Sequence, residues 1–212
     1  MPRLNWSAVG ERFYEAGVDR GVLYVGELAG VPWPGLVSVS ESPRGGEARP
    51  FYIDGFKYAN VAASEEFEAT ISAFQSPPEF ATCDGVSSVH NGLFATQQPR
   101  KSFGLSYRTK LGNDTEGVDF AYKIHLVYNA LAAPSGRTNS TVGQQLQPST
   151  LSWSITTLSP AVSGLRPTAH FVIDSRNTPE ALLADVEDIL YGSEVSSARL
   201  PSVAELLDMF NV

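Results

Sequence analysis

The chain has a single cysteine, Cys83, among its 212 residues. One thiol excludes an intrachain disulfide and offers no zinc-binding cysteine pattern, so we expect packing alone to hold the fold together. Long apolar segments are also absent. No run approaches the ~18 residues of a membrane-spanning helix, and the N-terminal residues lack the apolar core of a signal peptide. We therefore expect a soluble protein that is synthesised in the cytoplasm.

Charge is scarce and unbalanced. Charged residues make up 18% of the chain, below the ~25% of an average globular protein. The chain has 15 basic and 23 acidic residues, for a formal net charge of −8. Proteins that bind nucleic acid through its phosphates need clustered Lys and Arg. The composition therefore excludes a tight phosphate binder, and we expect any DNA that meets this protein to slide past it.

Catalytic motifs are missing too. No serine lies in a Gly-x-Ser-x-Gly elbow. Cys83 can be paired with His90 on paper, but no basic helix start accompanies it, so we expect a buried thiol. We expect His90, His125 and His170 on solvated or subunit-facing surfaces. The sequence thus predicts no catalytic, cofactor-binding or metal-binding residues and a protein that is not an enzyme, with a Cys or Ser hydrolase as a competing hypothesis.

The clearest pattern in the chain is strand periodicity. In residues 119–130, apolar residues alternate with a polar row that includes Lys123, His125 and Asn129. At ~3.3 Å per residue, such a strand extends about 40 Å. Residues 103–109 alternate in the same way, and a turn-rich segment joins the two runs. We expect a long hairpin with a protruding tip, followed by a long polar loop.

Other alternating segments, bounded by turn residues, indicate further strands. The Asp54-Gly55 pair predicts a tight hairpin turn, and with a second turn at 42–46 it indicates a β-meander. Residues 65–74 alternate with a period of two, which favours a strand over the competing helix. Strands are expected at 21–25, 36–41, 48–53, 56–61, 65–74, 151–157 and 169–173.

Clear helical signals are confined to the C-terminal part. Thr178 is suited to cap a helix at 178–191, with Pro179 at its first position. An apolar stripe follows, and Gly192 ends the pattern. We expect this helix to flank the β structure.

A second, shorter helix is expected at 202–212, where Ser202 and Glu205 have the spacing of a capping box. Residues 1–20 show no clear period, so an ordered arm and a short helix both remain open. No composition break marks a second domain. The sequence predicts one mainly β domain over residues 1–212 with helices appended.

Five extended segments carry a resemblance to a known family. They are residues 12–24 (RFYEAGVDRGVLY), 52–55 (YIDG), 80–85 (FATCDG), 92–100 (GLFATQQPR) and 122–132 (YKIHLVYNALA). On these segments the chain resembles the major tail proteins, or tail tube proteins, of long non-contractile-tailed phages that infect actinobacteria. The similarity covers essentially the whole chain.

This resemblance implies a phage tail tube fold: a β-sandwich or half-barrel subunit with a flanking α-helix, six of which close a ring-shaped barrel. It implies that rings stack helically around a tape-measure protein, with tail terminator and distal tail proteins at the tube ends. Double-stranded DNA would pass through without specific binding, and the protein would belong to the virion tail with no membrane partner. The alternative is another β-rich virion component, namely a tail terminator, a capsid decoration protein or a receptor-binding protein.

Within such a tube we expect Glu66, Glu68, Lys123 and His125 to line the lumen, although simple solvent exposure explains the two glutamates equally well. Inter-ring contacts are expected in the N-terminal arm and in protruding loops, because long structureless loops are usually functional. The loops are 111–118 and 132–150, and the candidate contact residues are Trp6, Asn113, Asp114, Arg137 and Gln144.

Overall fold

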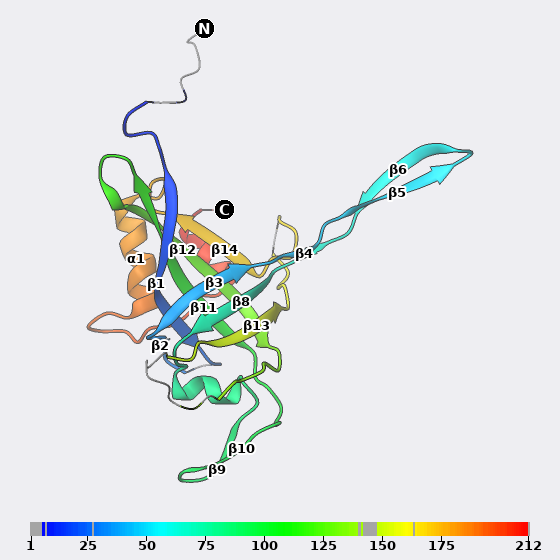
Figure 1. Ribbon diagram of the computed structural model, residues 1–212. Helices are drawn as coiled ribbons and strands as arrows, with labels where there is room; N and C mark the ends of the chain where they lie inside the picture. Colours follow the sequence, from blue (N-terminus) through cyan, green and yellow to red (C-terminus); the bar gives the residue numbers. More distant parts are fainter. Residues whose placement is uncertain are drawn as a thin grey trace.

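A computed structural model describes residues 6, 8–26, 28–139, 141, 148–162 and 164–211. In this part of the chain β-strands predominate (Figure 1), and the mainly β fold expected from the sequence is confirmed. The strands are β1 (Tyr14–Tyr24), β2 (Val31–Pro32), β3 (Leu36–Glu41), β4 (Arg44–Gly45), β5 (Ala48–Ile53), β6 (Phe56–Ala62), β7 (Glu65–Glu66), β8 (Glu68–Ala73), β9 (Ser87–His90), β10 (Leu93–Ala95), β11 (Phe103–Asn113), β12 (Gly117–Ala132), β13 (Leu151–Thr157) and β14 (His170–Asp174). The helices are the 3-10 helix η1 (Pro78–Thr82), α1 (Glu180–Tyr191) and α2 (Val203–Met209).

The longer strands form one antiparallel sheet that curls back on itself. Its order is β2-β1-β11-β12-β13-β8-β3, and β14 pairs with β12 outside this path. On the edge opposite β11, the 16-residue strand β12 has two partners: residues 123–127 pair with β14, and residues 130–132 pair with β13. Between them Asn129 adopts a left-handed backbone with φ of 49°. The sheet divides beside this residue, and the β13-β8-β3 part packs over the β1-β11-β12 part (Figure 1).

The central strands are buried on both faces. On β12, Ile124 and Leu126 pack in a hydrophobic cluster that includes residues of α1 and α2. On the opposite face, Val127 joins Trp153 in the cluster between the two parts of the sheet. His125 shares that inward face, because side chains two residues apart point the same way. The polar face of β12, which was expected to meet a lumen or a neighbouring subunit, is therefore partly enclosed, because the other part of the curled sheet packs over it.

The two α-helices lie near their expected positions. Gly192 ends α1 with a φ of 85°, and Ser202 and Glu205 make both hydrogen bonds of the expected capping box. The start of α1 differs by one residue: Pro179 takes the cap position, and the Thr178 hydroxyl donates instead to a preceding backbone carbonyl. Neither α-helix of the described residues is long and apolar enough to cross a membrane.

A long hairpin projects from the body of the protein (Figure 1). We call residues 44–66 the arm: β5 and β6 form its outer part, and β4 pairs with β7 at its base. The expected tight turn at Asp54-Gly55 joins β5 to β6. At the base Gly45 has a φ of 86°, and a Cβ there would lie 2.3 Å from the Ser64 carbonyl oxygen. Only glycine fits such a position.

The expected β-meander is wrong. Strand β3 pairs with β8 and not with β5, because the chain leaves the sheet through the arm and returns to it at β8. The Asp54-Gly55 turn was identifiable locally, whereas the partner of β3 depends on residues far along the chain. The segment 42–46 is therefore the entry to the arm and no hairpin turn.

Two other boundaries differ from expectation. Strand β1 begins at Tyr14, so part of the expected N-terminal arm is strand, paired with β11 as far as Gly112. The protruding loop expected at 111–118 shrinks to a turn at 114–116, because the same pairing extends β11 and β12. In the expected loop 132–150, the described residues after β12 contain no helix or strand until β13 begins.

An ion pair joins the middle of β1 to β11. Arg108 donates two hydrogen bonds of 2.7 Å to the Asp19 carboxylate, which lies directly opposite it in the strand register. The Arg108 guanidinium also lies over the Tyr122 ring, 4.6 Å from its centre. Hydrogen bonding to Arg108 is the main cause of the lowered pKa of Asp19, against an opposing effect of burial.

We expect Asp19→Asn to lower the free energy of unfolding by about 1 kcal/mol at pH 7, because a charge-assisted, bidentate contact is lost. A lowered pKa means that the contact stabilises the fold at pH values above the ordinary 3.8 and is lost as the pH falls through the folded-state pKa. Urea unfolding at pH 7 and at acidic pH tests this. The difference from wild type should vanish in acid, and Asp54→Asn, at the exposed arm tip, should match wild type throughout.

Candidate functional site

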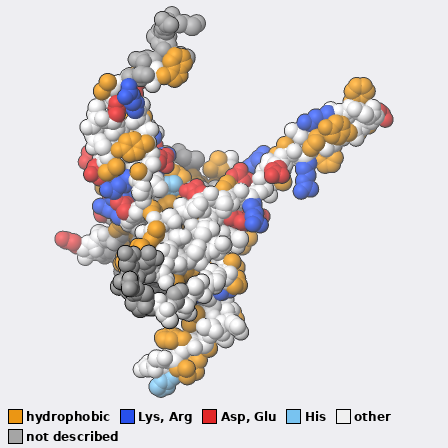
Figure 2. Space-filling view, viewed as in Figure 1, with side chains coloured by type: hydrophobic (Ala, Val, Ile, Leu, Met, Phe, Trp, Pro, Cys, Tyr) orange, Lys and Arg blue, Asp and Glu red, His pale blue; other side chains and the backbone are white. Residues whose placement is uncertain are grey.

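The arm exposes large apolar side chains to solvent in the single chain (Figure 2). Phe56 and Tyr58 are the most exposed of them, at 79% and 75%. A two-stranded hairpin is marginally stable in water by itself, and exposed apolar patches usually mark interaction sites. The arm is therefore a candidate docking surface. Its large exposed apolar residues are Phe51, Tyr52, Ile53, Phe56, Tyr58 and Val61.

Two further projections expose apolar residues. The β9-β10 hairpin presents Val89, Leu93 and Phe94, each more than half exposed, and near the N-terminus Trp6 and Val9 are 82% and 78% exposed. The arm, the β9-β10 hairpin and the N-terminal segment leave the body in different directions (Figure 1). This shape suits an assembly in which one surface of a subunit meets a different surface of the next.

Two of the residues expected at ring-to-ring contacts shape the β11-β12 turn. Asn113 is only 4% exposed, and its side-chain oxygen accepts hydrogen bonds from the backbone of Thr115 and Glu116. The expectation that Asn113 is an external contact is therefore wrong, because the turn itself occupies its polar group. Asp114 accepts a 2.9 Å hydrogen bond from the backbone of Gly10 and so ties the N-terminal segment to the hairpin tip.

The other three expected contact residues differ in their surroundings. Trp6 is exposed, as expected for a residue awaiting a partner. Arg137 is about half exposed and makes an ion pair with Asp84 at 2.6 Å, so its charge is already matched within the subunit. Gln144 lies outside the described residues. Contact of Trp6, Asp114 or Arg137 with a neighbouring ring stays a prediction.

Two of the residues expected to line a lumen are engaged in ion pairs. Glu68, whose side chain is 18% exposed, lies 3.0 Å from Arg44 at the base of the arm. Lys123 pairs with Glu15 across β1, β11 and β12. Glu66 is exposed on β7. Their place relative to a lumen stays a prediction.

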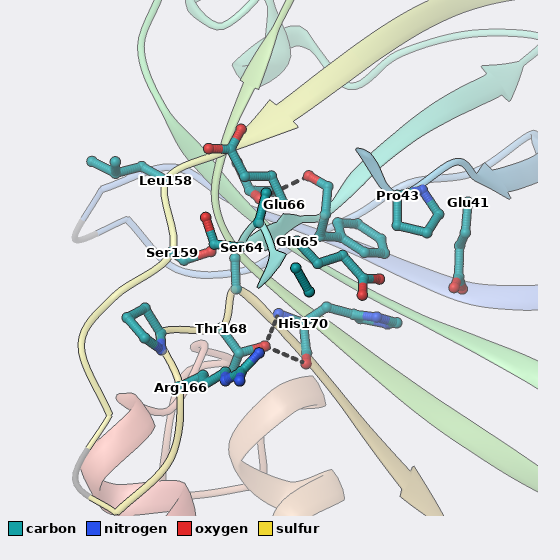
Figure 3. Close-up of a pocket in the computed structure, with 16 residues that line it drawn as sticks. Glu41, Pro43, Ser64, Glu65, Glu66, Leu158, Ser159, Arg166, Thr168 and His170 are labelled. Atoms are coloured by element: carbon teal, nitrogen blue, oxygen red, sulfur yellow. Dashed lines mark hydrogen bonds between the residues drawn. The ribbon is translucent and has the colours of Figure 1, made fainter. Parts of the chain in front are cut away.

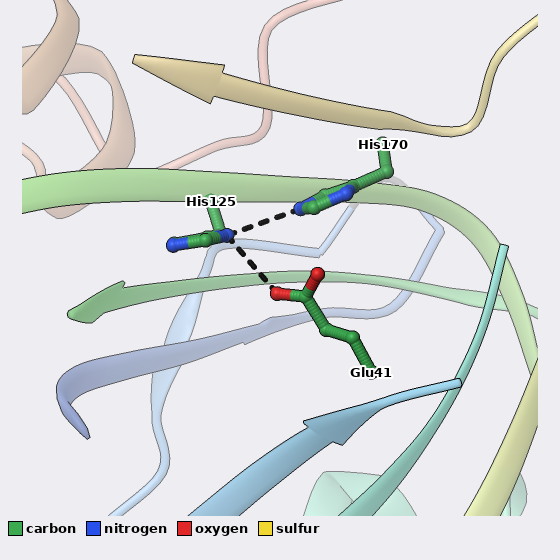
Figure 4. Close-up of side chains that lie close together, drawn as sticks. All are labelled: Glu41, His125 and His170. Atoms are coloured by element: carbon green, nitrogen blue, oxygen red, sulfur yellow. Dashed lines mark hydrogen bonds and ion pairs between the residues drawn. The ribbon is translucent and has the colours of Figure 1, made fainter. Parts of the chain in front are cut away.

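The expectation that His125 faces a lumen is wrong, because it is 6% exposed and belongs to an internal polar cluster (Figure 4). Its Nδ1 lies 3.1 Å from His170 Nε2 and 3.4 Å from Glu41 Oε1, and its Nε2 lies 3.0 Å from the Thr109 hydroxyl. The Tyr107 hydroxyl donates a 2.7 Å hydrogen bond to Glu41 Oε1. We call Glu41, His125 and His170 the histidine-glutamate cluster.

Strand pairing brings the cluster together. In the β12-β14 register His125 lies opposite Val172, and Val127 lies opposite His170, so the two histidines are diagonal neighbours on one face. Glu41, at the end of β3, approaches from the opposite part of the sheet (Figure 4). The cluster cannot be recognised from the sequence alone, because the two histidines are 45 residues apart. Period-two patterns place each of them on a strand, but no local signal reports which strands pair.

Both histidines of the cluster are neutral at pH 7. Burial, followed by the proximity of His170, lowers the pKa of His125 to about 4. Burial likewise lowers the pKa of His170, against an opposing effect of Glu41. The 3.4 Å approach of Glu41 to His125 is therefore a contact between a carboxylate and a neutral ring, and no ion pair. Each neutral imidazole has one nitrogen with a free lone pair.

A cleft of about 770 Å³ gives solvent access to the cluster (Figure 3). Glu41 and His170 form part of its wall, together with Glu65 and Glu66 from the base of the arm. The cleft thus lies between the base of the arm and the start of β14. Its carboxylates make it more attractive to cations than to anions.

Cys83 and His90 do not form a catalytic pair. The Cys83 thiol is fully buried, and burial raises its pKa, so the reactive thiolate is disfavoured. His90 is exposed on the β9-β10 hairpin, where its Nδ1 lies 3.3 Å from the carbonyl oxygen of the adjacent Asn91. The expectation of a buried structural thiol agrees with this environment.

No protein-family model and no curated protein sequence matches the chain. Among solved structures, it is similar to a chain of the anti-feeding prophage cap, described as a tube-terminating cap, with a TM-score of 0.36 and 12% identity over 82% of this chain and 97% of that one. It is also similar to a chain of the anti-feeding prophage baseplate, with a TM-score of 0.38 and 10% identity over 80% of this chain and 97% of that one. Both are distant similarities in fold to components of a phage-tail-like particle.

Proposed function

We propose that this protein is the structural subunit of a phage tail tube, in which six copies close a ring and rings stack around a tape-measure protein. The genome passes through the tube during ejection. The proposal includes the absence of enzymatic activity and a place in the virion tail, between a tail terminator and distal tail proteins. It draws on the extended sequence resemblance described above.

The exposed arm is the observation that carries the proposal. Exposure of hydrophobic side chains such as Phe56 and Tyr58 to water is unfavourable. The outer arm is a two-stranded hairpin with no core of its own in which these side chains could be buried. Docking on another copy of the subunit removes them from water. An arm that reaches away from its own sheet is suited to contact a neighbouring ring in a stack.

Charge supports the same proposal. With a formal net charge of −8, the subunit repels phosphate groups on average, which suits a conduit whose DNA must move without being held. The composition favours a passive wall.

Electron microscopy of the purified protein tests the proposal directly. We expect rings with six-fold symmetry, or tubes, at high protein concentration, with a mass per ring of six subunits in native mass spectrometry. A protein that stays monomeric at all concentrations, even with the tape-measure protein present, contradicts it.

Copy number distinguishes a tube subunit from the other β-rich virion components. A tube subunit repeats along the whole tail and must be among the most abundant proteins of the virion. A tail terminator or receptor-binding protein occurs in few copies at one end. Quantitative mass spectrometry of purified virions separates these cases, and labelling by antibody at a single tail end, or on the capsid, points to the alternatives.

A further inference from the structure

We propose that Glu41, His125 and His170 bind a divalent transition metal ion, with Zn²⁺ as the matching ion. Two imidazole nitrogens and one carboxylate are a donor set that Zn²⁺ favours in proteins. The inference concerns the isolated subunit and does not depend on the proposed function.

The spacing of the donor atoms fits one shared ion. The three potential ligand atoms all lie within 4.8 Å of one another. With Zn–N distances of about 2.0–2.1 Å and tetrahedral angles, two ligand atoms stand roughly 3.3 Å apart. The 3.1 Å between the histidine nitrogens and the 3.4 Å from His125 to Glu41 lie on either side of that value. The third pair, His170 and Glu41, lies within 4.8 Å, so the partly exposed Glu41 carboxylate has to move toward His170 when an ion binds.

Neighbouring side chains already orient the donors. With Nδ1 of His125 on the metal, its Nε2 proton points at the Thr109 hydroxyl, 3.0 Å away. The Tyr107 ring stacks on His125 with 4.5 Å between ring centres, and its hydroxyl holds the Glu41 carboxylate. Such outer contacts fix ring orientation and raise ligand basicity in known metal sites.

The site is accessible and has room for a further ligand. Glu41 and His170 form part of the wall of the cleft shown in Figure 3, so an ion can enter from solvent, and water can complete a four-coordinate shell. A hydrogen bond between the two histidines is the competing arrangement. On metal binding the shared proton moves to the far nitrogen of its own ring, so that His125 Nδ1 and His170 Nε2 both offer lone pairs to the ion, and the carboxylate adds a third bond.

A bound ion would join β3 directly to the paired strands β12 and β14, from which β13 and β8 separate it in the sheet order. Glu41 ends β3, where the chain enters the arm, while His125 and His170 belong to the paired strands β12 and β14. The metal would therefore cross-link the two parts of the curled sheet near the base of the arm. Its expected consequence is greater stability of the subunit, because ligands that bind only the folded state stabilise it.

Titration of chelator-treated wild-type protein with Zn²⁺, followed by calorimetry, tests the proposal. We expect one ion per chain, a higher unfolding temperature with added Zn²⁺, and the visible absorption bands of tetrahedral Co²⁺ when cobalt replaces zinc. His170→Ala and Glu41→Gln should each weaken binding by about 100-fold or more. His90→Ala, which removes the exposed histidine of the same chain, should bind as wild type does.

Glu41 is partly exposed, so Glu41→Gln is expected to fold even if His170→Ala does not, and circular dichroism checks both variants. Thr109→Val should weaken binding by about 10-fold, because it removes only the outer contact of His125. Failure of the wild-type protein to bind Zn²⁺ overturns the proposal. So does undiminished binding by folded Glu41→Gln or His170→Ala, or a loss of binding in His90→Ala. None of these results bears on ring formation, which is tested separately.

Discussion

Replacing Phe56 and Tyr58 together with aspartate should abolish the assembly of rings into tubes and leave the subunit folded. The two side chains are 79% and 75% exposed in the isolated subunit, so the substitutions remove little internal packing. Exposed substitutions usually change stability by only about 0.5 kcal/mol. In an assembled tube, by contrast, burial of each aromatic side chain contributes about 1.5–3 kcal/mol. An introduced carboxylate would lose its hydration at the same place, which is unfavourable.

Together, burial of the Phe56 and Tyr58 side chains contributes about 3–6 kcal/mol per arm, which corresponds to at least about a hundredfold in the affinity of each contact. The concentration at which tubes form should rise accordingly. Sedimentation and negative-stain electron microscopy over a concentration series measure this, with circular dichroism as the check on folding. Phe56→Leu with Tyr58→Phe retains apolar surface at both positions and should assemble. Normal tubes from the double aspartate variant would show that the arm does not dock.

Trp153→Ala should destabilise the subunit by about 3–5 kcal/mol, a large part of the ~5–15 kcal/mol available to a typical domain. Trp153 is fully buried, with its ring centre 5.2 Å from that of Phe80 and 5.8 Å from that of Trp33. Its indole nitrogen has no hydrogen-bond partner among the described residues, so the loss comes from packing and the resulting cavity. For a chain of this size the midpoint of thermal unfolding should fall by about 6–20 °C.

Trp6→Ala is the matched control, since Trp6 is 82% exposed. Its unfolding midpoint should equal that of wild type, because no core contact is removed. The same variant tests the N-terminal segment as an inter-ring contact, through a loss of tube formation without a loss of stability. Urea unfolding of both variants, followed by tyrosine fluorescence and circular dichroism, provides the comparison. Equal stability of Trp153→Ala and wild type would contradict the described packing between the two parts of the sheet.

Local features of the sequence were reliable where the cause lies within a few residues. The Asp54-Gly55 turn, the Ser202-Glu205 capping box and the strand at 151–157 all stand where the pattern places them. Turn and cap residues act through their own backbone angles and hydrogen bonds, and alternation reports strand geometry directly. These features need no information from distant parts of the chain.

Predictions that depend on distant partners were less successful. Strand β1 starts earlier than its own periodicity indicates, because β11 supplies pairing partners from Tyr14 to Tyr24, interrupted after Ala16 and after Asp19. The β-meander failed because the arm separates β3 from its sequence neighbours. His125 was expected outside because it alternates with apolar residues, but both faces of β12 are covered. A period of two identifies the two faces of a strand and does not say what lies against each.

The sequence by itself determined the low charge, the mainly β composition, the tight turns and the helix caps, since each is a property of one residue or its near neighbours. Only the tertiary structure decided that β3 reaches β8, that the arm projects with its apolar side chains exposed, and that Glu41 meets His125 and His170. Those outcomes depend on pairing between strands far apart in the chain, where many registers satisfy the same alternating pattern and packing of the whole sheet selects one.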